Sequence, residues 1–293
     1  MPLFAKFLKL LTLPLLLSVM AACSGNGTRK KHPTPSEYDL NHPKVIKLGD
    51  KLNEISGLAF YPKDSSVFAI VDEVGVLFKI ILTDDKPVIQ QWHFAAHADY
   101  EDMVLLDSTF YVLKSDGDII AAKFTSPDSV NSQKYDIPLK GKNEFEILYY
   151  DSSLRKLVMI CKDCEVDNKS TVSTWAFDPQ SRSFDSGPFI MDANMIDRSK
   201  TGAEKEKKFK PSAAAINPIS GDLYIISSIN KALVIADKSG KVKSVYPLPA
   251  DLYKQPEGIA FTPSGDMFIS NEAAGEGLPN LLYFKYKKAV HEK

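Results

Sequence analysis

Five residues whose side chains could bind a cation recur at a regular interval along the chain. They are Ser56, Glu101, Glu146, Ser212 and Glu257, and successive members are separated by 45, 45, 66 and 45 residues. If this repeat is structural, the five side chains occupy the same place in each repeat and converge. Carboxylate and hydroxyl oxygens suit a hard cation such as Ca²⁺, which takes about six to eight oxygen ligands. The spacing therefore predicts a metal or ligand site, with Ca²⁺ as the candidate cofactor.

Further polar residues are expected at the same mouth. Asp72, Asn271 and Glu272 each follow the second apolar segment of their repeat. Carboxylates held close together raise one another's pKa unless a cation neutralises them. Two other interpretations stay open: the carboxylates are solvated in a water-filled tunnel, or they accept backbone N–H groups that tie neighbouring repeats together. A register shift of one residue would also turn Glu146 away from the others.

A catalytic centre is the rival interpretation of the same region. Glu257, Asn271 and Glu272 fall within one repeat, as the metal-binding residues of a lactonase or esterase could. The other repeats offer no matching asparagines, and the sequence has no G-x-S-x-G segment, phosphate-binding glycine loop or Ser/His/Asp arrangement. We assign no catalytic residue. The sequence favours a non-enzymatic protein that binds a small molecule or protein partner at this mouth, and a metal-dependent hydrolase is the alternative.

Cys161 and Cys164 have the C-x-x-C spacing of redox and zinc sites. No second cysteine pair or histidine pair stands near them to complete a zinc site. They follow an expected strand and enter a polar loop, whereas a thioredoxin-like motif needs a strand followed by a helix. The pair is interpreted as structural thiols or one local disulfide.

The repeat that carries these residues consists of four short apolar segments separated by Pro, Asp, Ser and Gly turns. The first segments are Ser56–Pro62, Glu101–Asp107, Glu146–Ser152, Ser212–Pro218 and Glu257–Pro263. Short strands at regular spacing, with a period of 45 residues, are typical of a β-propeller. In a propeller the first strand of each blade lines the central tunnel. The period therefore predicts an all-β fold in which the five recurring residues form a ring.

The repeats favour five four-stranded blades, with six as the alternative. The last repeat ends after its third strand, and an unassigned strand, Lys44–Leu48, precedes the first repeat. Pairing these two segments would complete the last blade, close the ring and cover two exposed strand edges. A sixth blade would need strands in residues 178–210, which are interpreted as a long surface loop.

The N-terminus predicts export and lipid attachment. Residues 1–22 combine two lysines with a short apolar run, Leu10–Val19, which is too short to span a bilayer comfortably. Met20-Ala21-Ala22-Cys23 resembles a bacterial lipobox, in which the cysteine is acylated and anchors the chain to the lipid membrane. We expect a flexible tether at 23–41 and a single propeller domain at 42–290. Ser24 is not a retention acid, which favours the outer membrane over the inner one.

The composition agrees with a folded, water-soluble body and excludes one class of partner. Hydrophobic residues make up 44% of the chain and charged residues 25%, ordinary values for a globular domain. Without the two lysines of the signal, 34 basic residues face 37 acidic ones. No basic field is present to attract nucleic acid.

Four phrases of the repeat resemble a known family. They are Glu54-Ile-Ser-Gly-Leu-Ala-Phe, Asp99-Tyr-Glu-Asp-Met, Phe145-Glu146 and Gln255-Pro-Glu-Gly-Ile-Ala-Phe. These look like the SdiA-regulated (YjiK-like) family of bacterial envelope proteins, and the similarity extends over about residues 42–288. The resemblance implies a propeller, an envelope location and a biochemical role that is not established. Some relatives are similar to calcium-binding propellers.

Overall fold

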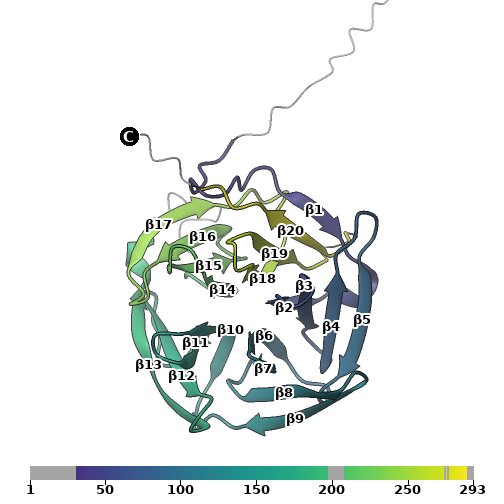
Figure 1. Ribbon diagram of the computed structural model, residues 1–293. Coiled ribbons are helices and arrows are strands. Elements are labelled where there is room, and N and C mark those ends of the chain that lie inside the picture. The colour runs from purple at the N-terminus through teal and green to yellow at the C-terminus, as the bar shows by residue number, and fades with distance from the viewer. Residues whose placement is uncertain (1–30, 197–207, 274, 276, 289–293) are drawn as a thin grey trace, which may run out of the picture. The chain divides into compact units, whose positions relative to one another are not determined.

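Five antiparallel sheets of four strands stand around a central axis and form a five-bladed propeller (Figure 1). The computed structural model describes residues 31–196, 208–273, 275 and 277–288. The five-blade prediction is confirmed, and residues 178–210 do not add a sixth blade among the described residues. The predicted signal at 1–22 and Cys23 lie outside these residues. No described helix is long and apolar enough to cross a membrane.

In each blade the four strands are given in order from the centre of the ring to its outside. Blade 1 holds β2 (Ile55–Tyr61), β3 (Ser66–Val71), β4 (Val76–Ile81) and β5 (Val88–His93). Blade 2 holds β6 (Tyr100–Leu106), β7 (Thr109–Lys114), β8 (Ile119–Ser126) and β9 (Ser129–Tyr135). Blade 3 holds β10 (Asn143–Asp151), β11 (Lys156–Cys164), β12 (Thr171–Asp178) and β13 (Ser183–Asp192). Blade 4 holds β14 (Ala213–Ile216), β15 (Leu223–Ser227), β16 (Ala232–Ala236) and β17 (Val242–Pro247). Blade 5 holds β18 (Pro256–Phe261), β19 (Met267–Asn271), β20 (Asn280–Phe284) and β1 (Lys44–Lys47). Two short 3₁₀ turns, η1 (Asp50–Leu52) and η2 (Ala193–Met195), complete the elements.

Blade 5 is closed by the N-terminal strand, as the sequence predicts. β1 pairs with β20 in antiparallel register, with Lys44 opposite Tyr283 and Lys47 opposite Asn280. The first strand of the chain therefore completes the sheet built by its last three strands. This pairing gives β20 a neighbouring strand on both sides, so the last blade has its four strands and the ring is closed.

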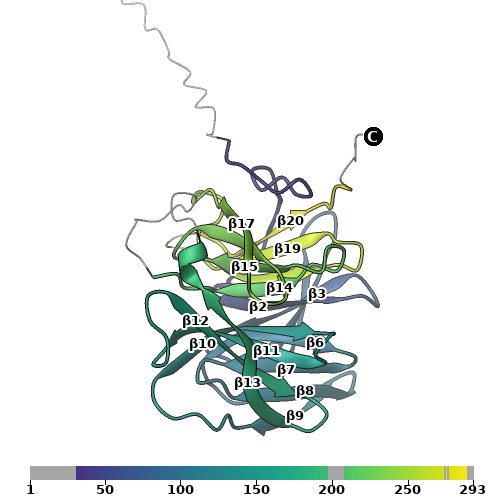
Figure 2. The same cartoon turned by 90° about the vertical axis from the view of Figure 1, so that its left-hand side faces the viewer.

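The burial pattern explains why the inner segments read as continuous apolar runs. All six residues of β3 are buried, whereas the outer strand β5 alternates between exposed and half-buried residues. Five apolar clusters fill the five interfaces between neighbouring blades. The core is therefore a set of five wedges, not one centre. Figure 2 shows the ring from the side, with β13 and β17 turned toward the viewer.

The folded body begins before the predicted boundary at residue 42. Tyr38 and Leu40, assigned to the tether from their polar surroundings, are 1% and 0% exposed and pack between blades 4 and 5. The Tyr38 hydroxyl donates to the Gly265 carbonyl at 2.6 Å and accepts from Asn217 Nδ2 at 2.8 Å. The tether therefore ends before Tyr38, because Tyr38 and Leu40 fill part of the interface between blades 4 and 5. Local composition gives no sign of that contact.

Candidate functional site

Four of the five predicted ring positions coincide with an irregularity in the inner strand, whereas Ser212 precedes β14, which pairs with β15 in regular register. In β6 the register shifts between Tyr100 and Asp102, so Glu101 is left without a partner in the ladder. The same shift occurs at Glu146 in β10 and at Glu257 in β18. A bulge of this kind leaves the extra residue unpaired and redirects its side chain. Because the bulge recurs at one point of the repeat, the three glutamates face the same mouth.

Eleven residues from four blades line a cavity of about 390 Å³ at this mouth. They are Ser56 and Asp72 of blade 1; Asp99, Glu101 and Ser115 of blade 2; Glu144, Glu146 and Lys162 of blade 3; and Gln255, Glu257 and Glu272 of blade 5. Seven of these residues carry carboxyl groups and one carries an ammonium group. The cavity is therefore acidic and almost entirely polar.

Two of the predicted site residues do not line the cavity. Ser212 is buried, and its hydroxyl donates to the Pro256 carbonyl at 2.8 Å, so it joins blade 4 to blade 5. Asn271 is 0% exposed, and its Nδ2 donates to Leu252 O and to Asn280 Oδ1. The remaining predicted residues, Ser56, Asp72, Glu101, Glu146, Glu257 and Glu272, come together in the one cavity.

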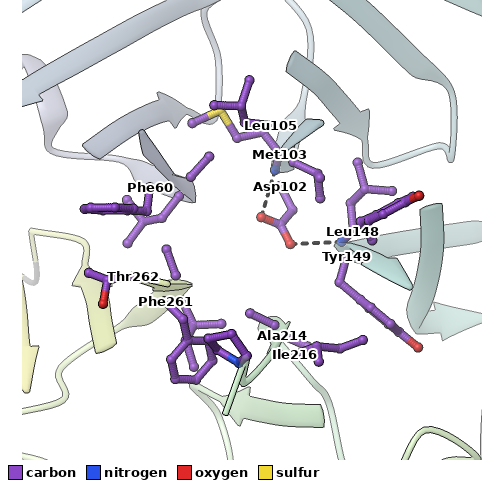
Figure 3. A pocket seen from close by; sticks show the side chains of 18 of the residues that line it. Phe60, Asp102, Met103, Leu105, Leu148, Tyr149, Ala214, Ile216, Phe261 and Thr262 are labelled. Carbon is purple, nitrogen blue, oxygen red and sulfur yellow. Dashed lines mark hydrogen bonds between the residues drawn. The ribbon is translucent and has the colours of Figure 1, made fainter. Parts of the chain in front are cut away.

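Hydrogen bonds between blades account for some of the polar residues near the ring. The Ser56 hydroxyl donates to the Glu101 carbonyl, and the Ser270 hydroxyl donates to the Ser56 carbonyl. Asp102 is buried and accepts the N–H groups of Met103 at 2.8 Å and Leu148 at 2.9 Å (Figure 3). Asp102 therefore joins blade 2 to blade 3, and Ser56 and Ser270 join neighbouring blades through backbone carbonyls, whereas the predicted ring glutamates line the cavity.

Asp72 of blade 1 and Glu101 of blade 2 have raised pKa values. Burial raises the pKa of Asp72 to about 7, and a hydrogen bond with the Asp99 carboxyl group adds to the effect. A hydrogen bond between two carboxyl groups requires that they share a proton. Burial, with repulsion from Glu146 and Asp99, raises the pKa of Glu101 to about 9. These groups retain protons near neutral pH in the absence of a cation.

Blade 5 contributes two further carboxyl groups with raised pKa values. Burial, together with the charges of Glu146 and Glu272, raises the pKa of Glu257 to about 8. Burial raises the pKa of Glu272 to about 7, with repulsion from Glu54 and Glu146. The shifts on opposite sides of the cavity have the same origin, which is the removal of several negative charges from bulk water.

Lys162 supplies the positive charge among the residues that line the cavity. Burial alone would lower its pKa, but Glu146, Glu101 and Glu257 outweigh burial and raise it. Its ammonium group donates to the Glu146 carboxylate. Glu146 is therefore already paired, which makes it a poorer metal ligand than Glu101 or Glu257. Lys162 was not among the predicted site residues.

A disulfide holds the segment that carries this lysine. Cys161 and Cys164 are bonded to each other, with their Cα atoms 6.0 Å apart, so the disulfide is the correct choice between the two structural interpretations. The bridge spans the end of β11, and Lys162 lies inside it. On the next residue, the Asp163 carboxylate accepts from Lys210 Nζ at 3.2 Å. Both sulfurs are used, so a metal site with Asp167 at this place is excluded.

A second, apolar cavity of about 400 Å³ lies at the C-terminal ends of the inner strands (Figure 3). Its walls include Phe60, Leu105 and Phe261, and it shares no lining residue with the acidic cavity. Between the two cavities the inner strands come very close. A Cβ atom added to Gly57 would lie 2.5 Å from Met103 N, so this position tolerates only glycine. The central channel is thus divided into an acidic mouth and an apolar mouth.

The acidic cavity could hold a divalent cation through carboxylate oxygens. Asp72, Asp99, Glu101, Glu257 and Glu272 are the candidates, and all are hard oxygen ligands. Within the described part of the chain, no three of these carboxyl groups place oxygens within 4.8 Å of one another. The site is therefore wide, and water must supply part of the coordination shell. Such a site predicts weak binding, with a Kd of roughly 10⁻⁴ to 10⁻³ M, as in extracellular calcium modules.

Comparisons with known proteins agree with the fold and the family resemblance. The family described as SdiA-regulated matches residues 36–285. Myxococcus xanthus glutaminyl cyclase is similar in structure, with a TM-score of 0.55 and 16% identity over 84% of this chain and 96% of that one. A luciferin-regenerating enzyme gives a TM-score of 0.52 and 10% identity, covering 83% of this chain and 95% of that one. The PQQ-bound aldose sugar dehydrogenase of Streptomyces coelicolor gives 0.51 and 10% identity, covering 84% and 99%.

These structural likenesses show the propeller fold alone, because identity is at most 16%. No curated protein sequence matches the chain significantly. The chemistry of the site must therefore be argued from its own residues.

Proposed function

This chain belongs to the SdiA-regulated family, and on that premise we propose that it is a lipid-anchored propeller of the bacterial envelope that binds Ca²⁺ in the acidic cavity. A ligand or protein partner then binds at the mouth of the cavity that holds the cation. One observation carries the proposal: seven carboxyl groups from four blades surround a single cavity with one ammonium group among its lining residues.

The electrostatics of the cavity support a divalent cation. With Glu146 paired to Lys162, Asp72, Glu101 and Glu257 relieve their repulsion by retaining protons. A divalent cation can displace those protons and neutralise two charges at once. Ca²⁺ tolerates irregular geometry and several bound waters, whereas Mg²⁺ demands a near-ideal octahedron. The wide spacing of the carboxylates therefore favours Ca²⁺.

The hydrolase alternative has less support from the geometry. It requires Glu257, Asn271 and Glu272 to act on one bound metal, but Asn271 is buried away from the cavity: its Nδ2 donates to Leu252 O and Asn280 Oδ1, and its Oδ1, the atom that could bind a metal, has no hydrogen-bond partner and does not reach the cavity lining. Two members of the trio line the cavity and the third does not. Binding without catalysis is therefore the function that we propose.

Membrane attachment through Cys23 is the second part of the proposal. It is supported by the lipobox-like Met20-Ala21-Ala22-Cys23 and the short apolar run before it. Metabolic labelling of expressing cells with radioactive palmitate tests it. Label in the wild-type protein and none in Cys23→Ser is the expected result, and an unlabelled wild-type protein recovered in the soluble fraction would contradict it.

Calorimetric titration of the purified protein with Ca²⁺ and with Mg²⁺ tests the cation. We expect saturable Ca²⁺ binding that is weakened at least tenfold in Glu101→Gln and in Glu257→Gln. Asp222→Asn is the matched control, because Asp222 pairs with Lys243 on blade 4 and does not line the cavity. Absence of Ca²⁺ binding, or equal affinity in all four proteins, would remove the metal. Turnover of lactones or esters that Glu257→Gln abolishes would restore the hydrolase.

A further inference from the structure

A third cavity, of about 380 Å³, lies between blades 1 and 2 and shares no lining residue with the acidic cavity. Aromatic rings form much of its wall: Tyr61, Phe68, Trp92, Phe110 and Phe124. Its size falls within the usual range of small-molecule sites. Neither the family match nor the proposed calcium site assigns it a role.

The aromatic wall is rigid. Phe68 and Phe110, 3% and 2% exposed, pack with ring centroids 4.6 Å apart and form the floor. Trp92 and Phe124 are half-buried and meet edge to face, with centroids 5.1 Å apart and an angle of 88°. The Trp92 indole N–H donates to the Pro127 carbonyl at 2.8 Å, which fixes the orientation of the ring. A partly exposed indole is therefore held in place and offers an apolar platform.

The rim of the cavity carries both hydrogen-bond donors and acceptors. Exposed Gln90 offers an amide, and exposed Ser108 offers a hydroxyl group. Lys63 and Asp107, also exposed, bring one charge of each sign. The polar groups therefore surround the aromatic platform without a net charge of their own.

The remaining cation of the cavity is already engaged. The Lys79 ammonium pairs with the Asp64 carboxylate and lies 5.3 Å from the centre of the Tyr61 ring. An anionic ligand would find Lys79 neutralised and would meet Asp107. A cationic ligand would likewise find Lys79 neutralised, and Lys63 would repel it while Asp107 attracts it. A purely apolar ligand would strip water from the polar rim without replacing its hydrogen bonds.

We propose that this cavity binds a neutral saccharide. The C–H face of a sugar ring packs on the Trp92 platform, and its hydroxyl groups exchange hydrogen bonds with Gln90, Ser108 and Asp107. A neutral polyol is the class that matches an apolar wall, a mixed rim and a balanced charge. The proposal is independent of calcium and of the acidic cavity.

Fluorescence of Trp92 tests the proposal. The chain has two tryptophans, so Trp175→Phe leaves Trp92 as the only reporter. Maltotetraose, cellotetraose and chitotetraose are titrated as neutral probes, and 1-naphthoate as an aromatic anion. We expect at least one tetrasaccharide to change the emission saturably, whereas 1-naphthoate does not.

Variants then locate the binding by calorimetry. We expect Trp92→Ala to weaken the binding tenfold or more and exposed Gln90→Ala to weaken it severalfold. Gln180→Ala, an exposed glutamine of blade 3, is the matched control and should bind as the wild type does. Gln90→Ala keeps the test decisive if Trp92→Ala does not fold. No saturable change with any tetrasaccharide, saturation by 1-naphthoate alone, or wild-type affinity in the Gln90 variant would overturn the proposal.

Discussion

The raised pKa values in the acidic cavity predict that the calcium-free protein loses stability as the pH rises. In the folded state the pKa values of Asp72 and Glu272 are about 7, that of Glu257 about 8 and that of Glu101 about 9. In the unfolded chain these groups ionise near 4 to 4.5. Between these limits the folded state binds more protons, so the free energy of unfolding falls with increasing pH. The contribution of these groups to stability is largest below about pH 4, and the loss is complete only about one unit above pH 9, because Glu101 is half protonated at pH 9.

The size of this loss follows from the shifts. Each pKa unit corresponds to about 1.4 kcal/mol, so the shift of Glu257 from 4.5 to about 8 sets an upper limit of roughly 5 kcal/mol for this residue. The cavity is open to water, and screening reduces that limit severalfold. For the cluster together we expect a loss of about 3 kcal/mol between pH 5 and pH 9. Because this is a large part of the stability of an ordinary domain, it is measurable.

Urea denaturation followed by circular dichroism at pH 5, 7 and 9, with a chelator and without reductant, measures this loss. With a Kd of roughly 10⁻⁴ to 10⁻³ M, Ca²⁺ at about 10 mM should restore about 1.4 to 2.7 kcal/mol at pH 9 and little at pH 5, because the cation competes with protons for the same oxygens. Glu257→Gln should flatten the pH profile. A free energy of unfolding that stays constant or increases from pH 5 to pH 9 would show that the folded protein does not hold these carboxyl groups protonated.

Three further perturbations have expected outcomes. Lys162→Met removes the ammonium that neutralises Glu146, so the calorimetric Ca²⁺ affinity should rise severalfold; a decrease would show that Lys162 does not compete with the cation. Gly258→Ala places a Cβ atom 2.4 Å from the Ser56 carbonyl oxygen and should lower the free energy of unfolding by about 2 kcal/mol or more in urea titrations. No change would mean that blades 5 and 1 can move apart at this point without loss of stability. Tyr38→Ala removes a buried ring and its hydrogen bonds, and should cost about 3 to 5 kcal/mol in the same assay; a loss below about 1 kcal/mol would place Tyr38 in the tether after all.

The sequence predicts the parts of this fold that repeat. A period of 45 residues identifies the equivalent positions Glu101 and Glu146, and the structure places both at bulges of the inner strands. The unassigned strand Lys44–Leu48 predicts the closure of blade 5, because a three-stranded last repeat leaves an open edge. Repetition makes spatial equivalence readable from linear spacing.

Contacts between blades leave no such pattern. Nothing local to Lys162 indicates that its ammonium reaches Glu146, because the two residues lie on different strands, β11 and β10. Tyr38 lies in a polar stretch, yet it fills an interface more than 170 residues away at Asn217. Ser212 belongs to the repeat, but its hydroxyl is used for the bond to blade 5. These outcomes depend on three-dimensional packing that spacing alone does not encode.

We propose above all that the acidic cavity binds Ca²⁺. A crystal structure of the protein grown with Ca²⁺ and measured for anomalous scattering tests it most directly. We expect an anomalous peak among Asp72, Asp99, Glu101, Glu257 and Glu272, coordinated by carboxylates and waters at about 2.3 to 2.6 Å. The peak should disappear in Glu101→Gln or Glu257→Gln. A cavity without anomalous density at saturating Ca²⁺, or density confined to acidic groups elsewhere on the surface, would contradict it.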